Sequence, residues 1–311
     1  MIVIPYFLRQ AGLLHRALTS ICDQEYRSIQ VVVIDDDSTR SAADEITATL
    51  RDALPRLTVI RQSNQRVAAA RNTALDALRE KVLAIAFLDS DDYWDPAHIR
   101  NAAVSLSRGV DFYFAHQRIE GATTDWFGDR ADLLDESRLV PEALGIMQRA
   151  GSVATLIVSK CPVQTSSVVF RHALIPQVRF PRALRGCEDQ WVWWALLARS
   201  SANMYCPEPT VTYGAGGVGG YQHTSFGLVR FLVRRADWIR YRHHLLNKYP
   251  LTPGERRLQE KLGGHREAAL FSTLHSLRRR IAQQFSWDSH RINSHCKAPR
   301  MRRRTGAEVH L

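Results

Sequence analysis

Long hydrophobic runs are missing from this chain of 311 residues. No apolar run approaches the roughly 18 residues that a membrane-spanning helix needs, so we expect no spanning segment. The chain opens directly on IVIP, without the basic stretch, apolar core and small-residue cleavage site that mark a signal peptide. These absences predict a cytoplasmic protein.

Cysteine is also scarce. The five cysteines (Cys22, Cys161, Cys187, Cys206 and Cys296) are odd in number and widely scattered, and no two of them have CxxC spacing. This pattern argues against both a disulfide framework and a zinc site.

Positive charge is concentrated late in the chain, although the net charge of the whole is +11. From residue 226 onward there are 19 lysine and arginine residues against 6 acidic ones, a net charge of +13. The first 225 residues hold 23 basic and 25 acidic residues, a net charge of −2. The body of the protein is therefore nearly neutral, and its end is basic.

Short apolar runs alternate with helical patterns over the first hundred residues. The runs are nearly continuous, as expected for strands buried on both faces of a parallel sheet. The predicted strands are Ile2–Ile4, Val31–Ile34, Leu57–Ile60 and Val82–Leu88, and the predicted helices are Gly12–Cys22, Arg66–Leu78 and Ala97–Leu106. This order predicts an α/β fold with a doubly wound sheet.

The middle of the chain is less regular. We predict strands at Val110–Phe114 and Ser166–Phe170 and a helix at Cys187–Ala198. The segment Tyr213–Tyr221 contains five glycines and predicts a tightly turning or flexible loop.

Carboxylates gather where two of the predicted strands end. Three aspartates follow VVVI at residues 35–37, and Asp89, Asp91 and Asp92 follow VLAIAFL. Ligands of open α/β sheets bind beside the carboxyl ends of the strands, and fixed carboxylates suit Mg²⁺ or Mn²⁺. A single aspartate at a strand end more often caps a helix or shapes a turn, which is our interpretation of Asp95. Two clusters at one edge of a sheet predict a binding site.

Five segments, in order, resemble the family 2 glycosyltransferases of the GT-A fold. They are VIPYFLRQAGLLHRAL, VVVIDDDSTR, the N-x₆-RN spacing from Asn64 to Asn72, IAFLDSDDYWDP and CEDQWVWWALL. The resemblance covers roughly residues 1–215. It implies a GT-A-type, Rossmann-like mixed sheet flanked by helices, and the segment beyond it is predicted to be a helical basic C-terminal extension.

The resemblance implies that the first loop and the first acid cluster bind the nucleotide. Asp35 or Asp36 would hold the base and ribose, with Pro5 and Phe7 nearby. The glycine that usually follows the acid pair is Asp37 here. Aspartate tolerates left-handed backbone geometry better than most residues, so the turn can persist.

The same resemblance assigns the remaining acids. Arg71 would face the nucleotide or its diphosphate, and Asp89 would contact the ribose. Asp91 would ligate a divalent cation, Mn²⁺ or Mg²⁺, that bridges the two phosphates, with Asp92 as a second candidate. Asp189 would be the catalytic base, deprotonating the acceptor hydroxyl as it attacks.

Three residues near these motifs have open alternatives. Glu188 is either part of the site or only a negative charge favoured at a helix N-terminus. Trp193 lies among three tryptophans in four residues, of which at least one is expected in the core and one could stack on an acceptor sugar. His223, after the glycine-rich segment, either reaches the diphosphate or the metal, or is an ordinary surface or packing residue.

The resemblance implies an inverting transferase using a nucleotide-diphosphate donor, a UDP-sugar with UDP-glucose as first choice. The implied acceptor is a saccharide or lipid-linked saccharide in bacterial exopolysaccharide or other surface-glycan synthesis. We predict a donor-binding half at 1–115, an acceptor-binding half at 116–225, a helical basic extension at 226–290 and a disordered tail at 291–311.

The basic extension has two interpretations. Residues 226–246 alternate bulky apolar groups with arginines, as in a helix that lies on an anionic membrane surface, which would place the enzyme peripherally on the inner face of the cell membrane. The alternative is a helix packed on the catalytic domain with solvated arginines. We expect no nucleic-acid partner, because no recognisable binding module is present.

Parts of the sequence also fit two other functions. Residues 35–39 fit DxDxT, the nucleophile box of haloacid-dehalogenase-like phosphatases, with Asp35 as nucleophile and Asp37 as acid/base. That box normally ends the first strand, whereas a strand-helix unit precedes it here. A non-catalytic sugar-binding descendant is disfavoured because a binder needs no base at Asp189.

Overall fold

The computed structural model describes residues 1–7, 10–78, 82–122, 163–176, 178–184 and 186–214, two short strands at 137–139 and 147–149, and the positions 236, 237, 239, 241, 253, 256 and 257. The chain divides into two compact units, Met1–Leu262 and Gly263–Leu311, and all described residues belong to the first. Apart from those single positions, the predicted extension and tail lie outside the described residues. The domain boundaries at residues 115, 225 and 290 remain predictions.

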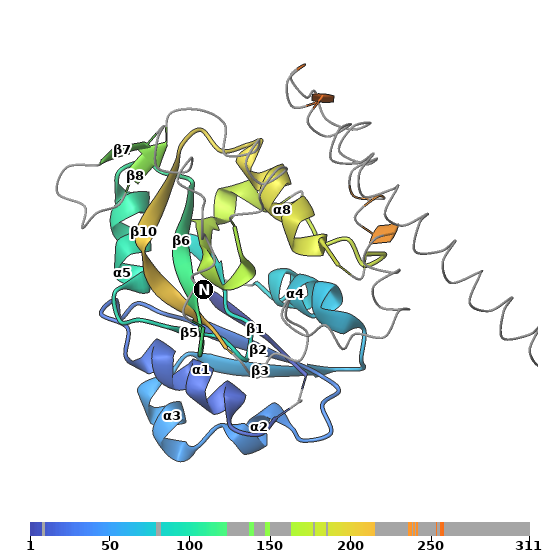
Figure 1. The fold of residues 1–311 in the computed structure, drawn as a ribbon. Coiled ribbons are helices and arrows are strands. Elements are labelled where there is room, and N and C mark those ends of the chain that lie inside the picture. The colour runs from blue at the N-terminus through green and yellow to red at the C-terminus, as the bar shows by residue number, and fades with distance from the viewer. Residues whose placement is uncertain are drawn as a thin grey trace, which may run out of the picture. The chain divides into compact units, whose positions relative to one another are not determined.

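The described part of the chain contains ten strands. They are β1 (Ile2–Tyr6), β2 (Val31–Asp36), β3 (Leu57–Gln62), β4 (Ala84–Phe87), β5 (Tyr93–Trp94), β6 (Phe112–Ile119), β7 (Ser137–Leu139), β8 (Met147–Arg149), β9 (Val168–Arg171) and β10 (Asn203–Tyr213). They form one sheet in the order β3-β2-β1-β4-β9-β6-β10-β8-β7, with β5 paired to β10 (Figure 1).

The sheet is mixed. Strands β3, β2, β1 and β4 run parallel to one another, as do β6 and β10. Strand β9 lies antiparallel between β4 and β6. The four strands predicted from the first hundred residues are therefore confirmed as a parallel group, within a sheet that also contains antiparallel strands.

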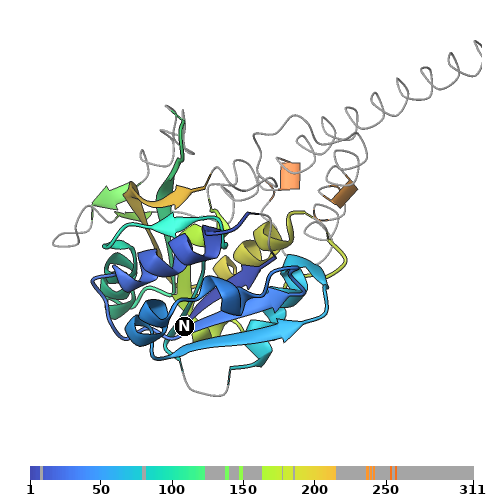
Figure 2. The same cartoon turned by 90° about the horizontal axis from the view of Figure 1, so that it is seen from below.

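Helices cover both faces of the sheet. They are α1 (Leu13–Cys22), α2 (Ala42–Glu45), α3 (Ala48–Ala53), α4 (Arg66–Asp76), α5 (His98–Ser107) and α8 (Glu188–Leu197). Residues of α1, α2, α3 and α5 share one hydrophobic cluster, and residues of α4 and α8 share the other. The first three helices lie below the sheet in Figure 1 and face the viewer in Figure 2.

The alternation of β1 explains how one sheet separates two cores. Ile2 and Ile4 belong to the cluster with α1, whereas Val3 belongs to the cluster with α4, because successive side chains of a strand point to opposite faces. In α1, Leu14 and Leu18 are one helical turn apart and fully buried. Within the described residues, no helix is both long enough and apolar enough to cross a membrane.

Two sequence-based details are corrected. The short helices α2 and α3 were not predicted, because four and six residues show no helical period. Asp95 does not cap α5, since the N-cap position is Ala97 and has no side-chain cap. The Asp95 carboxylate instead pairs with Arg118, at 2.6 Å from Nη2.

Candidate active site

The carboxyl ends of β1, β2 and β4 lie side by side, as their parallel pairing requires. Tyr6 at the end of β1 pairs in register with Asp35 of β2, and β4 pairs with β1 on its other side. Both predicted acid clusters therefore reach the same edge of the sheet. This is the edge at which open α/β sheets bind their ligands.

The carboxylate of Asp35 shapes the turn after β2. It is fully buried, and its two oxygens accept hydrogen bonds from the backbone N–H groups of Ser38 at 2.8 Å and Ala42 at 2.9 Å. A carboxylate held in this way cannot act as a nucleophile towards a phosphate. The phosphatase alternative is therefore not supported, and a contact between Asp35 and a nucleotide stays a prediction.

Asp36 joins β2 to the start of α4. Its Oδ1 accepts from the side chain of Gln62 at 2.7 Å and from the N–H of Gln65 at 2.9 Å. Its Oδ2 accepts from the N–H of Arg66 at 2.8 Å. The carboxylate satisfies donors that a helix N-terminus leaves unpaired, so it fixes α4 relative to the sheet.

Left-handed backbone geometry is concentrated around this edge. Among the described residues other than glycine, positive φ occurs at Asp37 (64°), Arg66 (74°) and Cys187 (63°). These residues follow β2, begin α4 and precede α8. Such conformations cost energy and cluster at functional sites. The prediction that Asp37 keeps the left-handed turn is confirmed.

Arg71 of α4 connects the two halves of the site. Only 3% of its side chain is exposed, and its guanidinium donates to Asp89 Oδ1 at 2.8 Å and to Glu188 Oε1 at 3.2 Å. The guanidinium also lies 5.2 Å from the centre of the Phe180 ring. Burial lowers the pKa of Arg71, but Asp89 and Glu188 raise it more, so this arginine stays charged.

The amino end of α8 carries two neighbouring carboxylates. Burial, followed by the charge of Asp189, raises the pKa of Glu188 to about 7, against the opposing effect of Arg71. Burial also raises the pKa of Asp189, whose oxygens accept from the N–H of Gln190 at 2.8 Å and from Thr165 Oγ1 at 3.4 Å. A raised pKa makes a carboxylate a better proton acceptor near neutral pH.

The turn after β4 separates the roles of two aspartates. Asp92 is buried, and its oxygens accept from Ser166 Oγ at 2.5 Å and from the N–H of Gly214 at 2.9 Å. Burial, with the charges of Asp91 and Asp89, raises the pKa of Asp92 well above its ordinary value. Asp92 therefore anchors the turn, and Asp91 is the better candidate for a metal ligand.

The residues present fit a cation that is shared with a substrate. Within the described ranges, no three His, Cys, Asp or Glu side chains are placed to hold a metal ion by themselves. Mg²⁺ commonly binds through one or two carboxylates together with substrate phosphates and water. Asp91, a half-buried carboxylate at the strand-end turn, could supply such a ligand.

Trp193 is a core residue. It is fully buried, with its ring 5.8 Å from that of Phe87 and 5.9 Å from that of Phe180. A sugar cannot stack on a ring that has no exposed face, so its predicted contact with the acceptor is not supported. Trp191 is the partly buried tryptophan of the same helix.

The first loop divides between buried and exposed residues. Pro5 is buried within β1, whereas Phe7 is 48% exposed directly after it. An exposed aromatic ring beside the acid clusters is placed where a nucleotide base could meet it. His223 lies outside the described residues.

Two residues that hold the acids together were missed from the sequence. Ser166 Oγ accepts from the N–H of Asp89 at 3.0 Å and donates to Asp92, so one hydroxyl ties both ends of the turn. Gly214 donates to Asp92 from beyond β10. The only sequence signal was that Gly214 opens the glycine-rich segment.

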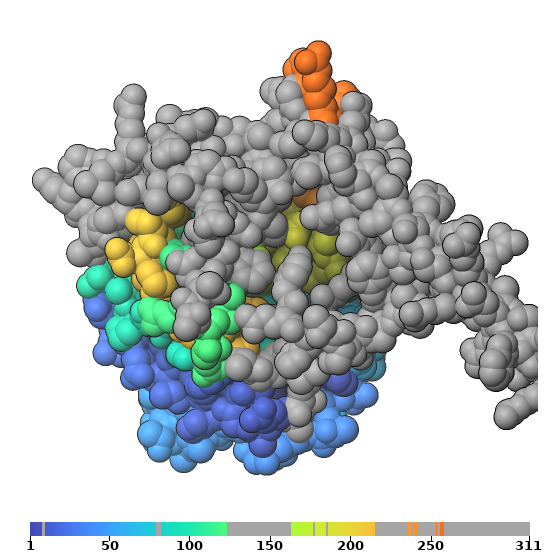
Figure 3. Space-filling view, viewed as in Figure 1, coloured from blue at the N-terminus to red at the C-terminus, as the bar shows by residue number. Residues whose placement is uncertain are grey.

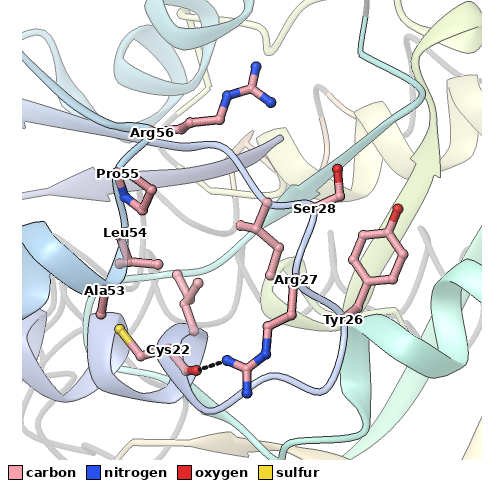
Figure 4. Close-up of a pocket in the computed structure, with 10 residues that line it drawn as sticks. Cys22, Tyr26, Arg27, Ser28, Ala53, Leu54, Pro55 and Arg56 are labelled. Carbon is pink, nitrogen blue, oxygen red and sulfur yellow. Dashed lines mark hydrogen bonds between the residues drawn. The ribbon is translucent and has the colours of Figure 1, made fainter.

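A surface pocket of about 200 Å³ lies elsewhere (Figure 4). It is lined by the end of α1 and by the segments preceding β2 and β3, including Cys22, Tyr26, Arg27, Leu54 and Arg56. These segments reach the amino ends of the strands, opposite the acid clusters. The pocket is therefore separate from the candidate active site.

The helices α1 to α3, coloured blue, form the lower surface in Figure 3.

The mixed sheet with helices on both faces is a GT-A fold, and comparison with solved structures agrees. The fold is similar to that of S. aureus TarS 1–349 in complex with UDP-GlcNAc, with a TM-score of 0.62 and 17% identity over 86% of this chain and 72% of that one. It is also similar to the mannosyltransferase PcManGT from Pyrobaculum calidifontis in complex with GDP-Man and Mn²⁺, with a TM-score of 0.61 and 16% identity over 90% of this chain and 74% of that one.

The sequence establishes the family. The profile of Glycosyl transferase family 2 matches residues 1–171. The chain is also 34% identical over 228 residues to the succinoglycan biosynthesis protein ExoW of Rhizobium meliloti (strain 1021), covering 69% of this chain and 68% of ExoW. The chain belongs to the family 2 glycosyltransferases.

Proposed function

We propose that this enzyme transfers a sugar from a UDP-sugar, with UDP-glucose as the first candidate, to a saccharide or lipid-linked saccharide acceptor in surface polysaccharide synthesis. The observation that carries the proposal is the chain of contacts from Asp89 through Arg71 to Glu188. It joins the strand-end acids to the helix that bears Asp189. The similarity to ExoW supports the polysaccharide setting, and the UDP-GlcNAc complex of TarS supports a uridine nucleotide.

In this proposal the donor lies across the acidic edge of the sheet. Phe7 lies against the base, and the turn that Asp35 or Asp36 shapes after β2 faces the base and ribose. Asp89 contacts the ribose. Arg71 is held between two carboxylates, so its charge acts on the diphosphate from behind Asp89 rather than by direct contact.

Asp189 acts as the general base. The acceptor hydroxyl loses its proton to this carboxylate as its oxygen attacks the anomeric carbon, and the sugar-phosphate bond breaks on the opposite side. A single displacement of this kind inverts the anomeric configuration, giving a β-linked product from an α-linked donor. Because the pKa of Asp189 is raised by burial, its carboxylate accepts a proton more readily than an exposed aspartate.

A divalent cation, Mn²⁺ or Mg²⁺, would neutralise the negative charge that develops on the departing nucleoside diphosphate. Asp91 would hold it, because Asp92 already uses both oxygens within the protein. The complex of the similar fold PcManGT with GDP-Man and Mn²⁺ supports the use of a divalent cation. We place the enzyme in the cytoplasm, peripherally at the inner face of the cell membrane where a lipid-linked acceptor would be found.

The anomer formed on slow donor hydrolysis tests the mechanism without knowledge of the acceptor. Proton NMR of UDP-glucose with enzyme and Mn²⁺ should show β-glucose before mutarotation, because water replaces the acceptor. Asp189→Asn should lower the rate by about 10²–10⁴-fold while UDP still binds. First formation of α-glucose would contradict inversion, and an unchanged rate in the variant would remove Asp189 as the base.

A further inference from the structure

The peptide group after Asp91 is held by two residues that are distant in the sequence. Arg16 of α1 donates from Nη2 to the carbonyl oxygen of Asp91 at 2.8 Å. Gly214 approaches the same oxygen so closely that a Cβ atom at that position would lie 1.8 Å from it. A side chain of any size is therefore excluded there, because a backbone atom is the obstacle.

Arg16 is itself fixed on its other side. Its Nη1 donates to Glu120 Oε1 at 2.7 Å, and its guanidinium lies 4.6 Å from the centre of the Tyr93 ring. Helix α1 packs against β5, which contains Tyr93 (Figure 1). The Arg16–Glu120 pair is about one-third exposed on each side, so the ion pair alone contributes little to stability. Its geometric effect is to direct Nη2 towards Asp91.

These contacts fix the backbone from which the Asp91 carboxylate extends. The Asp91 carbonyl is bound by Arg16, and the next residue, Asp92, is bound at both of its carboxylate oxygens. The backbone on the carboxyl side of Asp91 therefore has little freedom. A ligand that is oriented in advance loses less entropy on binding a metal.

We propose that Arg16 and Gly214 are positioning residues that orient the Asp91 carboxylate for the divalent cation. The inference rests on the proposed function, since it presumes a cation shared with the donor diphosphate. The inference adds to the proposed function two residues, Arg16 and Gly214, that would touch neither the donor nor the cation. Their contribution should appear in the affinity gained from the metal, and not in the metal-free affinity for nucleotide.

Calorimetry of UDP binding, with Mn²⁺ and with EDTA, separates these two quantities. We expect Arg16→Met and Gly214→Ala to reduce the affinity gained from Mn²⁺ by about tenfold or more, as loss of supporting contacts around metal ligands commonly does. The affinity of Arg16→Met in EDTA should not change, whereas for Gly214→Ala, whose Cβ must displace the Asp91 carbonyl, the ratio of the affinities with Mn²⁺ and with EDTA is the quantity compared. Arg16→Lys, which keeps a donor and a charge, should recover part of the gain. Thermal unfolding would verify that each variant is folded.

Arg100→Met is the matched control. Arg100 forms an ion pair with Glu25 whose partners are 37% and 44% exposed, and its second guanidinium nitrogen donates to Asn101 Oδ1 in its own helix, α5. It should keep the full effect of Mn²⁺. The inference is overturned if Arg16→Met and Gly214→Ala keep that effect, or if they lose affinity equally with and without metal. If the wild-type protein shows no metal-dependent binding of UDP, the proposed function fails and the inference with it.

Discussion

Arg71 and Glu188 are 117 positions apart in the chain, yet Nη1 of the arginine lies 3.2 Å from Oε1 of the glutamate. Both side chains are largely buried, at 3% and 12% exposed. The contact joins α4 to α8 and places a fixed positive charge between Asp89 and Glu188, the neighbour of the proposed base Asp189. The same contact therefore stabilises the packing of α4 against α8 and sets the charge beside the proposed base.

Removal of Arg71 should therefore destabilise the fold. Arg71→Gln leaves the largely buried Glu188 and the one-third exposed Asp89 without their cation, and breaking a buried pair costs about 3–5 kcal/mol. Urea unfolding at neutral pH would measure the loss. Arg179→Gln is the control, because Arg179 pairs with the exposed Asp76 and should cost less than about 1 kcal/mol. Equal losses in the two variants would contradict the account.

Glu188 should make stability depend on pH. Its pKa is about 7 in the folded protein against an ordinary value of 4.5, so between these values the native state keeps a proton that the unfolded chain has released. The free energy of unfolding should therefore fall as the pH rises through this window, and the stabilisation is fully present only below about pH 4.5.

Glu188→Gln tests that dependence, because glutamine stays neutral at every pH. Urea unfolding at several pH values from 5 to 8 should show a flatter profile for the variant, by about 1–3 kcal/mol across the window. A profile identical to that of the wild-type protein would show that Glu188 is already ionised in this range.

Arg66 should respond differently from Arg71, although both lie on α4. Its φ of 74° is unfavourable for any residue with a Cβ atom. Relief of this strain outweighs the added chain entropy of glycine, so Arg66→Gly should raise the free energy of unfolding, by at most about 1 kcal/mol. Arg66→Ala keeps the strain and should show no gain. A loss of stability in the glycine variant would mean that the Arg66 side chain stabilises the fold.

Much of the acidic edge could be predicted from sequence, for a physical reason. Strands buried on both faces appear as continuous apolar runs, so the residues at which they end are easily located. Parallel strands place those ends together, and Asp36 and Asp89 follow from that rule alone. The left-handed turn at Asp37 was also predictable, from the tolerance of aspartate for positive φ.

The remaining details depend on contacts between distant segments. The anchoring of Asp92 requires Ser166 and Gly214, which are 74 and 122 positions away. The position of Trp193 could not be inferred because α8 is buried on most of its surface, so its sequence shows no apolar stripe that would distinguish an inner from an outer tryptophan. Such features follow from tertiary packing.

The most direct test of the central claim is calorimetric titration with UDP of the wild-type protein and of Asp91→Asn, each with Mn²⁺ and with EDTA. The account predicts that Mn²⁺ strengthens binding to the wild-type protein by about tenfold or more and has no effect on Asp91→Asn, in which a neutral amide replaces the carboxylate ligand. Asp95→Asn, which alters the aspartate paired with Arg118, should behave as the wild type. Binding of UDP that is equally strong with Mn²⁺ and EDTA, or an Asp91→Asn variant that responds fully to Mn²⁺, would contradict it.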